Sequence, residues 1–178
     1  KIISISELNK NIIEKKFYEK ITITFDDVSE SVYLNALKIL RKYQIPFTLF
    51  VSLSLIDKKG YITTEQLLEL SEDPYCTIGS HGIDHIYYRK LSKEECNIQF
   101  RDSKKKLEEI IKKEINYFAF PYGSFFACSF ENLLIAKNSS YKLMFSTIPE
   151  PITKSFYVKS YFLPRICVTS NFIKLKIS

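Results

Sequence analysis

Two aspartates and two histidines have the types and spacing that could hold a metal ion. Asp26 and Asp27 are adjacent, and adjacent carboxylates repel each other unless a cation or a proton offsets their charge. His81 and His85 are the only histidines in the chain, and their i,i+4 spacing puts both imidazoles on one face if the segment turns helically. The competing interpretations are an aspartate that caps the following helix and two unrelated surface histidines.

Together these residues supply three ligands and one spare carboxylate. Two imidazoles and one carboxylate suit Zn²⁺ or a similar ion and leave one coordination position open for water, as in catalytic sites. The other aspartate would then lie beside that water, where hydrolysis needs a general base. The residue types leave open which aspartate has which role, but the set is sufficient for a metal-assisted hydrolase.

A third segment, residues 118–124, includes Pro121, Tyr122 and Gly123, which are typical of a tight turn. Turn amides that lie beside a metal can donate hydrogen bonds to a developing oxyanion. A turn without any catalytic role would have the same composition, so this signal is weak when taken alone.

The elements that must position these segments alternate between strand and helix patterns. Capping boxes at Thr63 with Gln66 and at Ser92 with Glu95 mark two helix starts. We expect strands at residues 21–25, 47–53, 76–80, 117–120, 142–147 and 161–168. We expect helices at residues 29–43, 63–71, 92–114 and 130–138.

Strand–helix alternation predicts an α/β fold with a mostly parallel sheet and helices outside it. The pattern alone does not choose between an open sheet and a barrel. In both architectures chemistry gathers at the carboxyl ends of the strands, which is where all three segments lie.

Composition predicts one globular domain over residues 1–178. Apolar residues make up 46% of the chain and charged residues 26%, so a disordered chain is disfavoured. The longest apolar stretch, residues 45–56, is too short and too polar to span a bilayer, and no secretory signal is visible.

The net charge is +6, but the densest lysine cluster, Lys104 to Lys106, continues into a mixed-charge helix. Nucleic acid is therefore not an expected partner.

The four cysteines lie far apart, and the absence of any CxxC spacing excludes a zinc ribbon or a thioredoxin-like motif. We expect them to be buried thiols. Large aromatic side chains near the proposed site are expected to pack in the core rather than to bind sugar rings. They are Tyr87, Tyr88, Tyr122, Phe125 and Phe126.

At this point the chain resembles a known family. The segment from Thr24 to Asp27, the pair His81 and His85, and residues 118–123 resemble the first three motifs of the polysaccharide deacetylases, carbohydrate esterase family 4. The likeness extends over about residues 21–168, and the third motif has an aromatic-Ala-aromatic-Pro-Tyr-Gly form. The resemblance implies a distorted (β/α) barrel and hydrolytic removal of acetyl groups from polysaccharide sugars, most often N-acetylglucosamine.

The resemblance also implies a role for each residue. Asp26 would be the general base, and Asp27, His81 and His85 would be the metal ligands. The backbone amide of Tyr122 would help to hold the oxyanion. Zinc is the expected metal, with cobalt, nickel or manganese as alternatives.

Three departures from the family pattern concern the site. Val28 follows the aspartates where the family usually has Gly, and Ala119 stands where an arginine often orients the base. No histidine follows His85, so the late histidine that commonly protonates the leaving amine is missing. We hypothesise that Arg165, in the last expected strand, pairs with Asp26 and replaces the missing arginine.

The expected activity is metal-dependent N-deacetylation of an acetylated glycan. The alternatives are an O-acetyl esterase, a catalytically silent carbohydrate-binding protein that retains the metal site, and a metal-free structural domain. A polymeric substrate favours the cell envelope or secretion over the cytoplasm, although scattered cysteines would suit a reducing interior. The sequence leaves open the glycan, the acetyl position and the oligomeric state.

Overall fold

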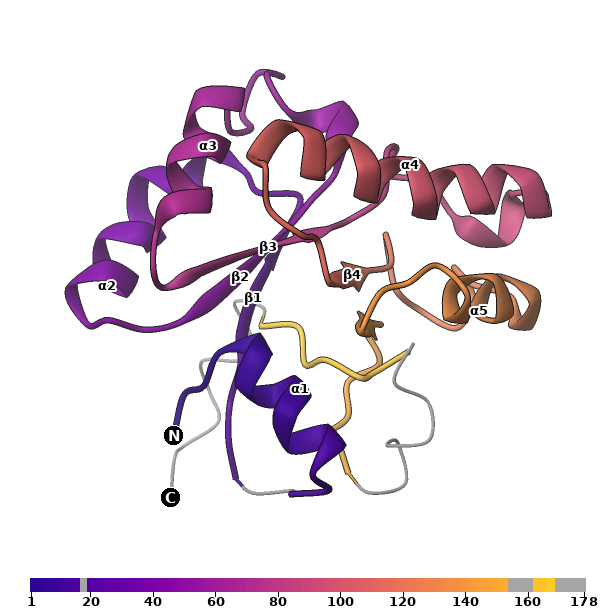
Figure 1. Ribbon diagram of the computed structural model, residues 1–178, viewed down its shortest axis with the longest axis horizontal. Coiled ribbons are helices and arrows are strands. Elements are labelled where there is room, and N and C mark those ends of the chain that lie inside the picture. The colour runs from indigo at the N-terminus through magenta and orange to yellow at the C-terminus, as the bar shows by residue number, and fades with distance from the viewer. Residues whose placement is uncertain (17–18, 154–161, 169–178) are drawn as a thin grey trace.

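A single parallel sheet organises the protein, whose computed structural model describes residues 1–16, 19–153 and 162–168. Its five strands follow one another across the sheet in chain order (Figure 1). They are β1 (Ile23–Asp26), β2 (Phe47–Val51), β3 (Cys76–Ser80), β4 (Tyr117–Ala119) and β5 (Leu143–Phe145). All neighbouring pairs run parallel, so the carboxyl ends of all five strands lie at one edge.

Strands β2, β4 and β5 are buried on both faces, as expected for a parallel sheet covered by helices, whereas the residues of β1 are half-buried. Alternate side chains point to opposite sides, so that Phe50 packs in one core cluster with Ala119 and Phe145, whereas Leu49 packs in another against the helices. The strand residues at the site therefore stand on a rigid, two-sided core.

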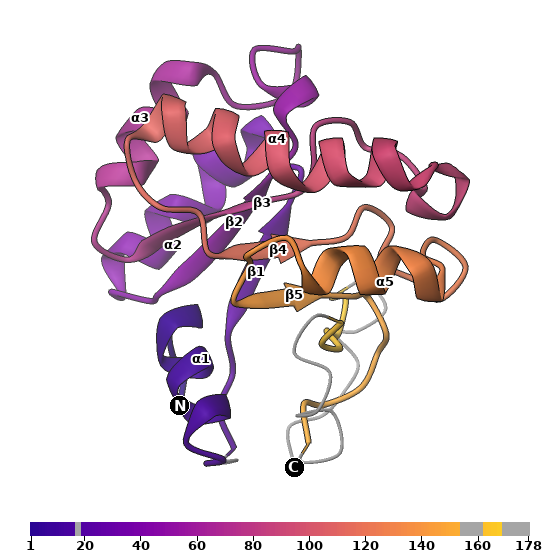
Figure 2. The same cartoon turned by 45° about the vertical axis from the view of Figure 1, so that its right-hand side comes forward.

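The described helices are α1 (Ile5–Ile13), α2 (Leu37–Lys42), α3 (Thr64–Glu72), α4 (Lys93–Ile111) and α5 (Phe130–Lys137), with short 3₁₀ turns at Leu53–Leu55 and Tyr88–Lys90. Helix α1 lies below the sheet, and the other helices pack outside it (Figure 2). Both predicted capping boxes are present, at Thr63 and Ser92, and a third at Ser129 was not predicted. Within the residues that the structure describes, no helix combines the length and apolar character needed to cross a membrane.

The sheet curls, and the segment of residues 162–168 lies across its open side. Leu163 forms an isolated parallel bridge with Phe145 of β5, and Arg165 donates hydrogen bonds to Thr24 and Asp26 of β1. The last described segment thus connects the two edges of the curled sheet. The predicted distorted (β/α) barrel with parallel strands and outer helices is confirmed.

Helix α1 was not predicted. It buries Ile5 and Ile12 in the core cluster that contains Phe50, Phe145 and Leu163, inside the curled sheet. The sequence contains two signals for this helix. Ser4 is an N-cap that accepts a hydrogen bond from the Glu7 amide, and Ile5, Leu8 and Ile12 lie on one helical face. This helix closes the interior with apolar side chains.

Three expectations about local structure are corrected. The expected helix 29–43 begins with a π-helical turn at Val32–Ala36, and α2 ends at Lys42. The expected strand 161–168 is only the Leu163 bridge within an extended segment, and residue 161 lies outside the described residues. The cysteines are free thiols; Cys96 and Cys128 are buried as expected, but Cys76 is half-buried and Cys167 is exposed.

Candidate active site

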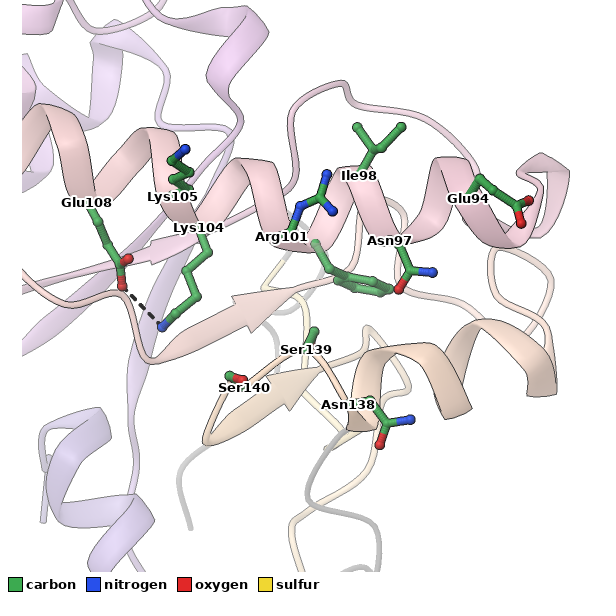
Figure 3. Close-up of a pocket in the computed structure, with 11 residues that line it drawn as sticks. Glu94, Asn97, Ile98, Arg101, Lys104, Lys105, Glu108, Asn138, Ser139 and Ser140 are labelled. Carbon is green, nitrogen blue, oxygen red and sulfur yellow. Dashed lines mark ion pairs between the residues drawn. The ribbon is translucent and has the colours of Figure 1, made fainter.

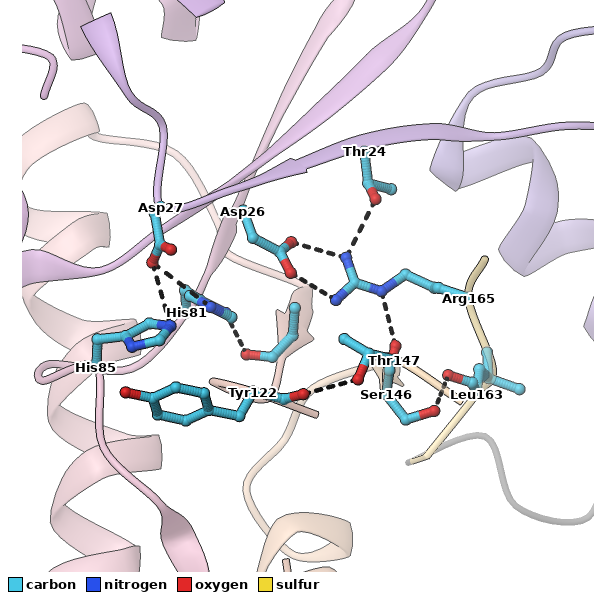
Figure 4. A network of polar contacts seen from close by, with 11 residues as sticks. Thr24, Asp26, Asp27, His81, His85, Tyr122, Ser146, Thr147, Leu163 and Arg165 are labelled. Carbon is cyan, nitrogen blue, oxygen red and sulfur yellow. Dashed lines mark hydrogen bonds and ion pairs between the residues drawn. The ribbon is translucent and has the colours of Figure 1, made fainter. Parts of the chain in front are cut away.

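The proposed site residues gather at the carboxyl edge of the sheet (Figure 4). Asp26 ends β1, His81 directly follows β3, and Tyr122 lies in the turn after β4. Parallel strands place these positions side by side although they are far apart in the chain. The structure therefore brings the three sequence segments together at one place.

Three potential ligand atoms converge on one point. The Nε2 atoms of His81 and His85 lie 3.7 and 3.5 Å from Oδ1 of Asp27, and all three donor atoms lie within 4.8 Å of one another. Ligands at roughly 2.0–2.1 Å from a tetrahedral zinc ion would be separated by about 3.3 Å. Small side-chain movements would thus suffice to coordinate one ion.

His81 is in the protonation state that a metal ligand requires. Its ring is 1% exposed, and its Nδ1 donates to the carbonyl of Ala119 at 2.7 Å, which leaves Nε2 as an acceptor. Burial lowers the pKa of His81 in spite of the opposing charges of Asp26 and Asp27. Burial thus favours the neutral form of His81, in which Nε2 presents a lone pair toward Oδ1 of Asp27.

Asp27 lies at the centre of a strained turn. Its φ is +60°, that of Val28 is +51°, and the Val28 amide donates to the Asp26 carbonyl across the turn at 2.7 Å. Left-handed backbone is unfavourable for a β-branched residue, and Val28 is held there with its side chain fully buried in the core. Oδ1 of Asp27 is buried without a hydrogen-bond partner among the described residues. A cation at this point would satisfy that oxygen.

Tyr122 lies in a similar three-residue turn. Its φ is +61°, the Gly123 amide donates to the Pro121 carbonyl, and Thr147 Oγ1 donates to the Tyr122 carbonyl at 2.7 Å. Within the described part of the chain, no group accepts a hydrogen bond from the Tyr122 amide. The Tyr122 amide is thus available as a donor at the edge of the site. The hydrogen bond from Thr147 that holds this turn was not predicted from the sequence.

Arg165 binds the carboxylate of Asp26 with two parallel hydrogen bonds of 2.7 Å. The same guanidinium donates to Thr24 Oγ1 and to the Ser146 carbonyl, and it lies over the ring of Phe50. Burial raises the pKa of Asp26, but the Arg165 charge and hydrogen bonds outweigh it and hold the pKa below its ordinary value. Arg165 therefore holds the Asp26 carboxylate in one orientation, and the carboxylate oxygens retain lone pairs that can accept a further hydrogen bond.

The aromatic residues near the site differ from expectation. Tyr88 is buried as predicted, but Tyr87 and Tyr122 are partly exposed and Phe125 and Phe126 are 64% and 84% exposed. Tyr87 and Tyr122 stack with ring centroids 4.0 Å apart, and the Tyr122 ring meets His85 edge-on. Core packing was therefore the wrong interpretation for these four side chains.

A groove on the described part of the molecule lies away from this cluster. It has a volume of about 720 Å³ and runs between α4 and the segment after α5, where Lys104 pairs with Glu108 (Figure 3). Its lining includes Arg101 and Ser139 but no residue of the Asp–His–His cluster. The candidate active site is instead an open region at the edge of the sheet.

Comparisons with known proteins agree with this architecture. The sequence model of the family described as polysaccharide deacetylase matches residues 15–142. YxkH of Bacillus subtilis (strain 168), whose name provisionally assigns it to the same family, is 30% identical over 137 residues, covering 76% of this chain and 48% of that protein. The poly-beta-1,6-N-acetyl-D-glucosamine N-deacetylase of Staphylococcus aureus (strain MRSA252) is 27% identical over 162 residues, covering 84% and 54%. The chain spans about half the length of these curated relatives.

Solved structures share the fold. The Streptococcus pyogenes deacetylase PplD in complex with acetate superposes with a TM-score of 0.86 at 22% identity, covering 96% of this chain and 75% of that one. IcaB from Ammonifex degensii superposes with a TM-score of 0.83 at 22% identity, covering 96% and 78%. The family match covers most of the chain and includes both acidic and histidine segments, so this chain belongs to the polysaccharide deacetylase family.

Proposed function

We propose that the protein is a metal-dependent hydrolase that removes N-acetyl groups from amino sugars of a polysaccharide or oligosaccharide. The observation that carries the proposal is the buried Asp27 oxygen that faces the Nε2 atoms of His81 and His85 without a hydrogen-bond partner. Two nitrogens and one oxygen suit Zn²⁺, with Co²⁺, Ni²⁺ and Mn²⁺ as alternatives. The named substrate of the staphylococcal relative, an N-acetylglucosamine polymer, supports the N-acetyl specificity.

When bound, the ion would lower the pKa of a water molecule and polarise the acetyl carbonyl. Asp26 accepts a proton from the attacking water, and Arg165 keeps its carboxylate ionised and correctly oriented. The amide of Tyr122 donates a hydrogen bond to the oxyanion that develops on the carbonyl oxygen. Asp26 then returns the proton to the departing nitrogen. The products are acetate and a free amine.

Removal of the metal is the direct test of this proposal. Treatment with a chelator is expected to abolish acetate release from N-acetylglucosamine oligosaccharides, and added Zn²⁺ or Co²⁺ is expected to restore it. Acetate release that survives complete metal removal, verified by elemental analysis, would contradict the proposal.

The choice of substrate separates the rival functions. We expect acetate release from N-acetylated oligosaccharides to exceed release from O-acetylated ones at equal acetyl concentration. The reverse order would identify an O-acetyl esterase. Glycan binding without any turnover, with zinc present, would instead identify a silent carbohydrate-binding protein.

The pH dependence tests the role of Arg165. In Arg165→Met the charge that lowers the pKa of Asp26 is lost while burial continues to raise it. Because Asp26 acts as an ionised base, the acidic limb of kcat/KM is expected to move to higher pH. Arg101→Met is the matched control, since Arg101 is exposed and pairs with Asp102 on α4. Superimposable profiles for Arg165→Met and the wild type would show that Arg165 does not act on the base.

A further inference from the structure

The two histidines are held at metal-binding distance without a helix. Their i,i+4 spacing would place both rings on one face of a helical turn, but residues 81–85 form an irregular loop. Their ring centroids nevertheless lie 5.3 Å apart, and both Nε2 atoms face Asp27. An irregular loop has no internal ladder of hydrogen bonds, so its shape must be imposed by neighbouring elements.

A buried side chain of α4 reaches into this loop. Gln99 is 6% exposed, and its Oε1 accepts hydrogen bonds from the amides of Ile83 at 2.9 Å and Asp84 at 3.2 Å. Its Nε2 donates to the Asp84 carboxylate at 3.1 Å. One carboxamide thus binds the two residues that immediately precede His85, by both backbone and side chain.

The fit between the loop and α4 is close. Gly82 has a φ of +84°, and a Cβ atom there would lie 2.8 Å from the Tyr88 hydroxyl and 3.2 Å from Oε1 of Gln99. A side chain at this position would therefore clash with the Tyr88 hydroxyl and crowd Oε1 of Gln99, which glycine avoids.

Other contacts hold the start of the loop. His81 and Gly82 are tied to the end of β2 and the residues after it, since the His81 amide donates to Val51 and the Leu53 amide donates to Gly82. The Ile83 carbonyl also accepts hydrogen bonds from the Ser54 amide at 2.8 Å and from the Ser52 hydroxyl at 3.2 Å. Among the described residues, Gln99 is the side chain that binds the amides of Ile83 and Asp84, which directly precede His85. The position of His85 relative to His81 therefore depends in part on Gln99.

We propose that Gln99 is a positioning residue that sets the separation of His81 and His85 for metal binding. The proposal rests on the proposed metal site and adds a residue outside the ligand set. Substitution of groups that orient metal ligands typically weakens metal affinity by roughly 10- to 100-fold. Gln99→Met keeps the length and volume of the side chain but removes all three hydrogen bonds, so we expect its zinc affinity to fall by about 10-fold.

The matched control is Asn132→Leu. Asn132 is also a buried carboxamide, 3% exposed. Its partners are Ser129, which caps the start of α5, and Cys96 of α4. Zinc affinity is measured by competition with a chromogenic chelator, and the Co²⁺ absorption spectrum reports the ligand geometry. We expect Asn132→Leu to lower the melting temperature yet keep wild-type zinc affinity and an unchanged Co²⁺ spectrum.

Three results would overturn the inference. Wild-type zinc affinity in Gln99→Met, or an equal loss in Asn132→Leu, would show that Gln99 has no specific part in positioning, while the metal site itself would stand. No zinc binding by the wild-type protein would remove the metal site and this inference together. If Gln99→Met does not fold, Gln99→Asn serves the same test, because its carboxamide is one methylene too short to reach the loop.

Discussion

Asp26→Asn is expected to lower kcat/KM by about 10²- to 10⁴-fold, the usual contribution of a general base. The amide is nearly isosteric with the carboxylate but has no charge with which to accept the proton of the attacking water. Zinc binding is expected to persist, because Asp26 is not one of the three converging ligands. Steady-state kinetics and metal analysis on the same preparation measure both effects.

The stability of this variant has to be measured as well, since Asp26 also neutralises Arg165. Losing one partner of a largely buried ion pair is expected to cost about 1–3 kcal/mol in the free energy of unfolding. Asp102→Asn is the matched control, because Asp102 pairs with the exposed Arg101 on α4. Activity of folded Asp26→Asn within a few fold of the wild type would exclude Asp26 as the base.

His81→Asn is expected to abolish both zinc binding and turnover. The Asn amide can occupy the place of Nδ1 and keep the hydrogen bond to the Ala119 carbonyl, but no atom replaces Nε2. Loss of one of three ligands leaves too few donors for a catalytic zinc site. Zinc per folded chain and acetate release measure the result.

The reciprocal variant is His81→Gln, whose amide reaches toward the position of Nε2 but loses the bond to Ala119. It is expected to retain more zinc than His81→Asn while losing more of the folding stability. Full turnover by His81→Asn with zinc absent would show that the reaction does not use this cluster.

Elements with strong local signals were predicted well. Strand β3 matches its predicted bounds, and the capping boxes at Thr63 and Ser92 start α3 and α4 as expected. These signals are local, because a cap or an alternating pattern depends on a few neighbouring residues. The fold class followed from their alternation.

The features that were missed depend on contacts between distant parts of the chain. The conformation of the loop from His81 to His85 depends on contacts with α4 and with the end of β2, which the sequence spacing does not encode. The exposure of Phe126 depends on where the turn after β4 leaves the core, which aromatic composition does not encode. The i,i+4 spacing indicated the right residues but not the way in which they are held.

The bond between Arg165 and Asp26 joins residues 139 positions apart. The three converging ligands, by contrast, all come from the first half of the chain, at positions 27 to 85. During synthesis, a nascent chain that has emerged only through α4 already contains Asp27, His81 and His85, but it lacks Ala119, which accepts the hydrogen bond from His81, and Arg165, which binds Asp26. Under the proposed function, the residues that would hold the ion are therefore synthesised before the groups that orient the site.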